Sequence, residues 1–190
     1  KSSLHSQDDK SKEQEDLKDV NEVDKAENVD NLSKPNDYKE VFKEDLFLGD
    51  SITDSLSFYE FLEDSQVIAE FGLTSKGARN IVDNIVKKNP RNIFIMFGMN
   101  DILTNETSGE FADNYTELIH DIKLKLPDSN IYVQSILPVD SKVKNKKPLL
   151  TNENIENFNQ ALMNMAKDED IKYLNIRTII EEDKDLIEPD

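Results

Sequence analysis

The sequence has no cysteine, only two histidines and only five glycines among its 190 residues. Without cysteine, a disulfide framework, a thiolate metal site and a cysteine nucleophile are excluded. No apolar run approaches the roughly 18 residues that span a bilayer, so we expect no membrane insertion of the folded domain. Average usage would give roughly 13 glycines in a chain of this length. We therefore expect the few that are present to lie where backbone geometry demands glycine.

Positive charge is also in short supply. The 23 basic residues are outnumbered by 40 acidic ones, and the formal net charge is -17. The electric field of so negative a chain repels phosphate backbones, which argues against a nucleic-acid partner. The sequence has no phosphate-binding glycine pattern, and the acidic run 181–183 lacks the alternating ligand spacing of a calcium loop. We expect neither a cofactor nor a metal.

Residues 1–36 differ in composition from the rest of the chain. They are mainly charged, amide and serine residues, with scattered Leu and Val and no aromatic residue or glycine. Such a segment buries too little apolar surface to offset its ordering entropy. We predict a disordered or weakly helical acidic tether there, with a dispensable solvated tail as the alternative, and a folded domain over 37–190. Because the chain begins with Lys1, we expect that a signal, anchor or tag has been removed and that the domain is extracellular or attached to the cell surface.

From residue 37 onward, short apolar runs alternate with amphipathic stretches. Runs such as 93–97 and 131–133 are apolar on both faces, which is typical of parallel strands covered by helices on each side. The alternation predicts an α/β fold, a three-layer α/β/α sandwich with a mostly parallel, flavodoxin-like sheet. Sites in such sheets lie at the carboxyl ends of the strands. The predicted strands are 45–49, 66–71, 92–97, 130–137 and 171–176, and the predicted helices are 56–62, 78–88, 110–126 and 152–167.

The run LGDS at 48–51 ends the first predicted strand and precedes a helical pattern. A serine at such a turn exposes its hydroxyl, and the helix N-terminus favours negative charge beside it, so Ser51 is a candidate nucleophile. Ordinary turn chemistry, with Ser or Asp as a helix cap, is the alternative. Gly72 and Gly98 also follow predicted strands, and Gly98 opens the run GMND, which adds the side-chain amide of Asn100. All of these residues are predicted at the carboxyl edge of the sheet.

This combination resembles the SGNH hydrolases, also called the GDSL family of esterases and lipases. The family is named for Ser, Gly, Asn and His in four successive blocks. The first block matches GDSI at 49–52, the second matches Gly72, and the third matches GMND at 98–101. The order of the blocks also agrees, and the resemblance covers residues 44–190. It implies a serine esterase or acylhydrolase that needs no cofactor and acts on an ester substrate.

The resemblance also implies the roles of the site residues. Ser51 would attack an acyl carbonyl and form an acyl-enzyme. The Ser51 N–H, the Gly72 N–H and the Asn100 side-chain amide would stabilise the oxyanion, and a side chain at Gly72 would crowd it. Each such donor is typically worth about 2.7 to 4 kcal/mol at the transition state. The supporting residues would be Asp50, Gly98 and Asp101; for the two aspartates, a turn residue and a helix N-cap, respectively, are the alternatives to a direct catalytic role.

The family's fourth block, Asp-x-x-His, supplies the general base and the aspartate that orients it, and the sequence does not contain this block. His5 lies in the predicted tether and His120 in a predicted helix of the outer layer, so we predict a solvated or partly packed histidine at both positions. Asp190 matches the orienting aspartate, and the histidine would follow three residues beyond it. We expect these 190 residues alone to be nearly inactive. The open explanations are a truncated chain, a site completed by a partner chain, and a degenerate relative that binds without catalysis.

The resulting hypothesis is a serine esterase that removes acyl groups, with O-acetyl groups on a bacterial cell-surface glycan as the expected substrate. A non-catalytic surface glycan-binding module is the main alternative, and a flavodoxin-like regulatory domain is a weaker one. The basic run 142–147 follows the fourth predicted strand. Contact with an anionic polymer near the site and a solvated loop are the two interpretations of this run.

Overall fold

The computed structural model describes residues 35–182 of the chain. The predicted tether, residues 1–36, lies almost entirely outside the described residues, so the boundary between tether and domain stays a prediction. His5 and Asp190 also lie outside them. The described part begins with a helix that the sequence analysis did not predict, α1 (Pro35–Val41).

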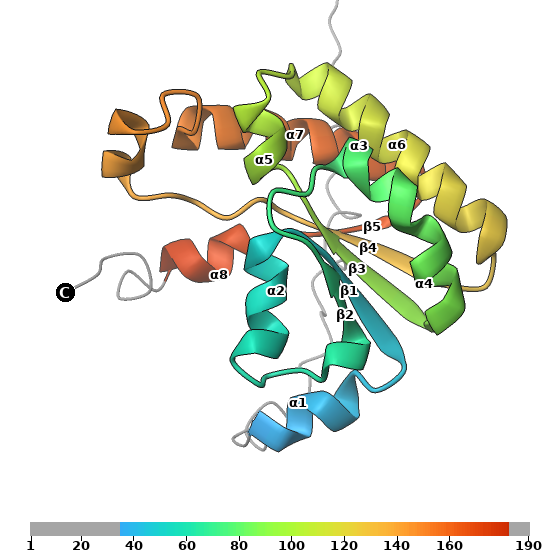
Figure 1. The fold of residues 1–190 in the computed structure, drawn as a ribbon. Helices are drawn as coiled ribbons and strands as arrows, with labels where there is room; N and C mark the ends of the chain where they lie inside the picture. The colour runs from blue at the N-terminus through green and yellow to red at the C-terminus, as the bar shows by residue number, and fades with distance from the viewer. Residues whose placement is uncertain (1–34, 183–190) are drawn as a thin grey trace, which may run out of the picture. The chain divides into compact units, whose positions relative to one another are not determined.

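A five-stranded sheet in the order β2-β1-β3-β4-β5 forms the centre of the fold, and every neighbouring pair is parallel (Figure 1). This confirms the predicted α/β class and parallel sheet. The predicted bounds of the first strand are confirmed, but the other ladders end earlier than predicted, since the chain leaves the sheet into loops at the carboxyl edge. The strands are β1 (Asp45–Gly49), β2 (Val67–Ala69), β3 (Asn92–Met96), β4 (Asn130–Gln134) and β5 (Lys172–Leu174).

The predicted helices are present with changed boundaries. The first begins five residues earlier than predicted, at Ser51, because Asp50 caps it. The predicted helix 78–88 is interrupted by a short 3-10 turn, η2. A helix after β3, α5, was not predicted. The bounds are α2 (Ser51–Phe58), η1 (Asp64–Gln66), α3 (Ser75–Ala78), η2 (Arg79–Ile81), α4 (Val82–Lys88), α5 (Met99–Leu103), α6 (Ser108–Lys125), η3 (Ser141–Asn145), α7 (Asn152–Asp168) and α8 (Arg177–Glu182).

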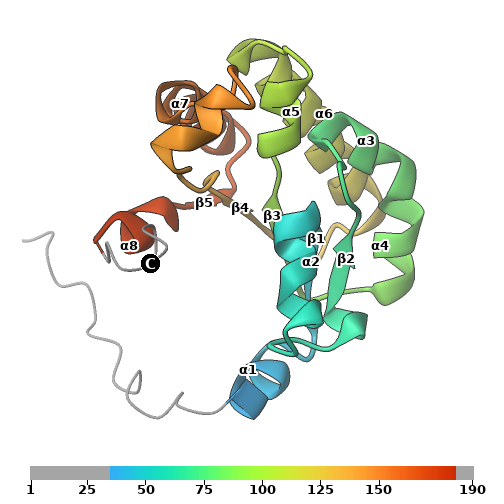
Figure 2. The ribbon, with the colours of Figure 1, turned by 60° about the vertical axis from the view of Figure 1, so that its left-hand side comes forward.

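The two faces of the sheet are packed differently. Figure 2 shows α3, α4, α6 and α7 on one side of the sheet and α2 and α8 on the other. On the first face Leu48 and Ile95 are fully buried in the main core. On the second face Phe94 stacks between Phe47 and Tyr132, with ring centroids 4.8 Å apart in both pairs. Among the residues that the structure describes, no helix has the length and apolar character needed to cross a bilayer.

Candidate active site

Ser51 lies where β1 ends and α2 begins. It is the first residue of α2 and is exposed, and Asp50 precedes it as the N-cap. The Asp50 carboxylate accepts a hydrogen bond from the Ile52 backbone N–H at 3.0 Å, which stabilises the first turn of the helix. The structure therefore makes Asp50 a helix cap and leaves Ser51 accessible to a substrate.

Asn100 connects the Ser51 turn to the loop that carries Gly72. Its side-chain Nδ2 donates to Asp50 Oδ2 and to the Leu73 carbonyl oxygen, both at 3.1 Å. Both hydrogens of the amide are therefore engaged within the protein. An oxyanion that binds this amide has to displace one acceptor, and the neutral carbonyl is the weaker competitor because charged acceptors form the stronger hydrogen bonds. The sequence analysis placed Asn100 at this edge but did not predict either bond.

Gly72 occupies an exposed position between β2 and α3, with a φ of +77°. This left-handed conformation favours glycine over any residue with a Cβ. A Cβ built at Gly72 would meet no heavy atom within 4 Å. The demand for glycine is therefore conformational, and the space beside it is open. The crowding that we expected at this position can arise only against a bound substrate.

Asp101 holds the same loop at its other end. Its side chain is fully buried, and Oδ1 accepts from the Ser75 backbone N–H at 2.9 Å and from the Ser75 hydroxyl at 2.6 Å. Ser75 is the first residue of α3. The predicted N-cap role of Asp101 is wrong, because Gly98 is the N-cap of α5 and Asp101 lies inside its first turn. Its carboxylate instead stabilises the start of a different helix.

Burial raises the pKa of both aspartates. It raises the pKa of Asp101 to about 6, against the opposing effect of the two hydrogen bonds from Ser75. Burial also raises the pKa of Asp50, against the effect of the Ile52 N–H. The second oxygen of Asp101, Oδ2, is buried and has no hydrogen-bond partner among the described residues. Ser75 is the one residue that donates hydrogen bonds to this buried carboxylate within the described structure. So few donors do not compensate for the loss of water, and the ionised form of Asp101 is therefore disfavoured.

Gly98 allows β3 to turn directly into α5. It is buried and has a φ of +138°. A Cβ at this position would lie 2.1 Å from Cδ1 of Ile136. Both the backbone conformation and the close packing therefore require glycine here. The tight turn brings Asn100 to the carboxyl edge beside the Ser51 turn.

The start of α3 contains two residues that the sequence analysis missed. Thr74 is the N-cap of α3, and its hydroxyl accepts from the Gly77 N–H at 3.1 Å. Ser75 makes the contacts with Asp101 described above. A Thr-Ser pair directly ahead of a helical pattern is a cap signature, and it would have placed the start of α3 correctly.

Of the predicted catalytic residues, the described part of the chain brings Ser51, Gly72 and Asn100 to one edge, but no histidine with them. His120 lies on α6 with 59% of its side chain exposed, and its Nε2 is 2.8 Å from Glu169 Oε2. Glu169 is the C-cap of α7, and this end of α7 lies at the amino edge of the sheet, opposite the Ser51 turn. The prediction of a partly packed, non-catalytic His120 agrees with this placement. Asp190, the predicted orienting aspartate, lies outside the described residues.

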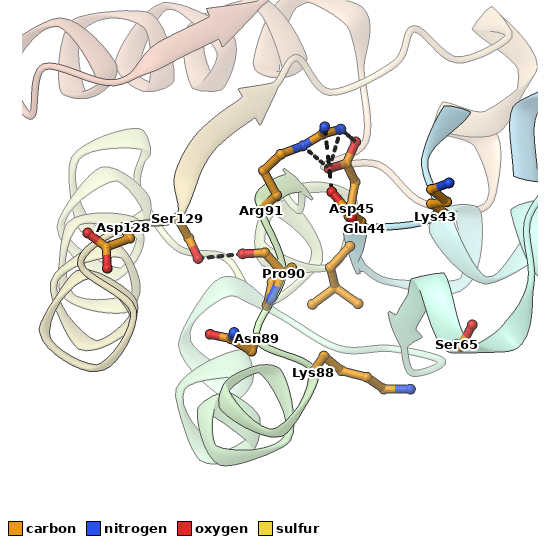
Figure 3. Close-up of a pocket in the computed structure, with 11 residues that line it drawn as sticks. Lys43, Glu44, Asp45, Ser65, Lys88, Asn89, Pro90, Arg91, Asp128 and Ser129 are labelled. Atoms are coloured by element: carbon orange, nitrogen blue, oxygen red, sulfur yellow. Dashed lines mark hydrogen bonds and ion pairs between the residues drawn. The ribbon is translucent and has the colours of Figure 1, made fainter. Parts of the chain in front are cut away.

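A depression of about 600 Å³ lies at the amino edge of the sheet, away from Ser51 (Figure 3). Its wall contains Arg91, whose guanidinium bonds the nearly buried carboxylate of Asp45. The Ser129 hydroxyl donates to the Pro90 carbonyl at 2.6 Å on the same wall. The first contact links the amino ends of β1 and β3, and the second links the segments that precede β3 and β4. Within the described residues, no group of three or more histidine and acidic side chains is placed to hold a metal ion.

An exposed serine at a strand-to-helix turn, with a side-chain amide and a loop glycine tied to that turn, is an arrangement suited to acyl transfer. The sequence model of the GDSL-like lipase/acylhydrolase family matches residues 47–190. The chain therefore belongs to this family, the SGNH hydrolases, which are carboxylic ester hydrolases. No curated protein matches the chain in sequence.

Solved structures of the family share the fold. A GDSL-like lipase from Bacteroides thetaiotaomicron aligns with a TM-score of 0.58 at 17% identity, over 74% of this chain and 72% of that one. A member of the lipolytic G-D-S-L family from Veillonella parvula aligns with a TM-score of 0.55 at 21% identity, over 74% of this chain and 81% of that one. The psychrotrophic esterase EstA from Pseudoalteromonas, inhibited by monoethylphosphonate, aligns with a TM-score of 0.53 at 17% identity, over 75% of this chain and 82% of that one. At such low sequence identities, these similarities are evidence for a shared fold alone.

Proposed function

We propose that this protein is a serine esterase that forms an acyl-enzyme on Ser51. The observation that carries the proposal is the hydrogen-bonded link from Asn100 to both Asp50 and Leu73. It ties the exposed Ser51 turn, the amide and the Gly72 loop into one unit at the carboxyl edge. A preorganised set of donors around an accessible hydroxyl is what acyl transfer needs.

In the proposed reaction the Ser51 hydroxyl oxygen attacks the ester carbonyl carbon while its proton passes to a general base. The carbonyl oxygen becomes an oxyanion held by the Ser51 and Gly72 N–H groups and by Asn100, which releases the Leu73 carbonyl. The intermediate collapses with loss of the alcohol, which takes the proton. Water then attacks the acyl-enzyme, yielding the carboxylic acid and restoring the serine.

The general base has to come from outside the described residues, because His120 is paired with Glu169 on the outer helices. The family resemblance assigns this role to a histidine oriented by Asp190. We infer that the 190 residues alone turn over esters slowly. Removing a triad member leaves only the effects of binding and of the oxyanion donors.

For the substrate, we propose O-acetyl or other short acyl esters on a cell-surface glycan, with the protein outside the cytoplasm. The supports are the strongly acidic, cysteine-free composition and the polar character of residues 1–36. A polar segment of that length can hold a domain at some distance from an anchor.

The test compares these 190 residues with the native protein, here called the full-length protein whatever its two ends are, using 4-nitrophenyl acetate turnover and fluorophosphonate labelling. We expect the full-length protein to turn over and to label at Ser51, and Ser51→Ala to abolish both. His120→Gln is the matched control and should leave turnover unchanged. Absence of turnover and labelling in the full-length protein, together with binding of an acylated glycan, would instead establish the non-catalytic binding module.

A further inference from the structure

The loop between β4 and α7 concentrates positive charge. Residues 140–151, here called the lysine loop, contain four lysines and a single carboxylate, Asp140. All four lysines are exposed. This is unusual in a chain whose formal net charge is -17. The four are Lys142, Lys144, Lys146 and Lys147.

Hydrogen bonds and core packing fix the backbone conformation of the lysine loop. Asp140 caps η3 by accepting from the Lys142 backbone N–H at 2.6 Å. The base of the loop is closed by Asn152, whose side chain both accepts from the Val139 N–H and donates to the Val139 carbonyl, each at 2.9 Å. Inside the loop, Leu150 is buried in the core and Val143 packs against it. The four ammonium groups therefore project from a fixed backbone, so binding a ligand costs less ordering entropy than it would on a free tail.

These lysines are not neutralised within the described part of the chain. None of the four forms an ion pair there, and Asp140, the one carboxylate within the loop itself, is used as a helix cap. Elsewhere, seven described basic residues are paired with carboxylates, as in the contacts of Arg79 with Glu117 and Asp121. The other five form no ion pair either, but they are spread over four separate elements and do not form a cluster of four in one loop: Lys76, Lys87, Lys88, Lys167 and Lys172. The basic residues in ion pairs are Lys39, Lys43, Arg79, Arg91, Lys123, Lys125 and Arg177.

The lysine loop leaves the sheet at the catalytic edge. It follows the carboxyl end of β4, and all five strands are parallel. Figure 1 shows η3 beyond the edge of the sheet at which α2 and α5 begin. The unpaired charge is therefore on the side of the molecule that carries Ser51 and Asn100.

We propose that the lysine loop binds the anionic groups of a polymer whose ester is the substrate, so that the substrate class is an acylated polyanionic glycan. The proposal rests on the proposed esterase function. An acidic protein repels a polyanion at long range, and a local cluster of unpaired ammonium groups at the site would orient such a chain with its ester toward Ser51. Carboxylate and phosphate groups would be recognised by the same charge.

The first experiment measures binding by the 190-residue chain carrying Ser51→Ala. The probes are polygalacturonate for carboxylates, inorganic polyphosphate for phosphates, and dextran as the neutral reference. We expect a polyanion to bind and dextran not to bind at low salt, and the relative strength of the two polyanions identifies the anion. Binding should weaken about tenfold or more when all four lysines become Gln, and the difference should vanish near 1 M salt, where the screening length is about 3 Å.

A matched control changes the same number of charges at the opposite edge. Lys87 and Lys88 end α4, Lys125 ends α6 and Lys167 lies in the last turn of α7. Replacing these four with Gln should leave polyanion binding nearly unchanged. Equal weakening in both quadruple variants would show a general charge effect and overturn the assignment to the lysine loop.

The second experiment measures turnover by the full-length protein on acetylated polygalacturonate and on acetylated xylan, which is neutral. We expect the lysine-loop variant to lose about tenfold in kcat/KM on the anionic substrate and to be unchanged on the neutral one. No turnover of either polymer or of 4-nitrophenyl acetate would refute the esterase proposal. Turnover of both polymers with no effect of the lysines would refute the lysine-loop proposal alone.

Discussion

Asp101 holds Ser75 with a single carboxylate oxygen, which accepts from the backbone N–H at 2.9 Å and from the hydroxyl at 2.6 Å. The preceding residue, Asn100, holds the Leu73 carbonyl at 3.1 Å. Two consecutive residues of α5 therefore fix the loop that carries Gly72. The position of the Gly72 N–H, one of the proposed oxyanion donors, depends on this pair of contacts.

Replacing Asp101 with Asn should flatten the pH dependence of stability between about pH 4 and pH 6. The pKa of Asp101 is raised from 3.8 to about 6 in the folded protein, so the folded state binds the proton more tightly than the unfolded chain. The resulting stabilisation is fully present below about pH 3.8, is lost as the pH rises through about 6, and amounts to about 3 kcal/mol. Denaturant unfolding of both proteins across this range measures it.

Ser75→Ala provides the matched control for Asp101. It removes the hydroxyl bond that favours the ionised carboxylate, so it should raise the pKa of Asp101 further, enlarge the total change in stability and extend it to higher pH. Native, D101N and S75A proteins with parallel stability curves would show that Asp101 does not titrate in this range.

Asn100→Ala should lower kcat of the full-length protein by about 10²- to 10³-fold, because it removes a proposed oxyanion donor. It also leaves Asp50 Oδ2 and the Leu73 carbonyl without this partner, so some loss of stability accompanies it. Steady-state kinetics on 4-nitrophenyl acetate, with unfolding curves for both proteins, separate the two effects. A stable, folded N100A protein with kcat within about twofold of native would exclude the oxyanion role.

The strands and the edge residues could be predicted from local pattern. The runs 46–48 and 93–96 are apolar on both faces, and each is followed within two residues by a residue that the turn requires, Asp50 or Gly98. In a parallel sheet those turns lie at the same edge, whatever the length or conformation of the loops elsewhere. Ser51 and Asn100 therefore fall together without any knowledge of side-chain geometry.

The hydrogen-bond network could not be predicted in this way. Whether the Asn100 amide faces Asp50 or solvent depends on how the tight turn at Gly98 orients α5, and that helix was itself missed because five residues are too few to show a helical period. The Asp101 contact with Ser75 joins residues 26 apart in sequence. The buried carboxylate of Asp101 bonds the first residue of α3 because α3 and α5 lie side by side in the fold, and this proximity cannot be read from the local sequence.

Gly98→Ala and Gly72→Ala form a matched pair, because both place a Cβ at a positive φ. At Gly98 the new Cβ also lies 2.1 Å from Ile136 Cδ1, whereas at Gly72 it meets nothing within 4 Å. We expect G98A to cost about 2 to 5 kcal/mol from strain and overpacking together, and G72A about 1 to 2 kcal/mol from strain alone. Chemical unfolding of the two variants tests the order. Equal losses would mean that the side chain of Ile136 moves aside at little cost.

Tyr115→Phe should destabilise the fold by about 1 to 3 kcal/mol although it removes only one oxygen atom. The Tyr115 hydroxyl is completely buried and accepts from the Phe97 backbone N–H at 3.0 Å. Phe97 directly follows β3, so its N–H loses the only partner that the described structure gives it, and a buried unpaired donor carries the full cost of desolvation. Tyr132→Phe is the control, because that ring is partly exposed and, among the described residues, its hydroxyl meets only Lys172, at 3.4 Å. It should change stability by less than about 0.5 kcal/mol. Thermal and denaturant unfolding of the two variants measure the difference, and a Y115F protein as stable as Y132F would show that water or another acceptor replaces the lost bond.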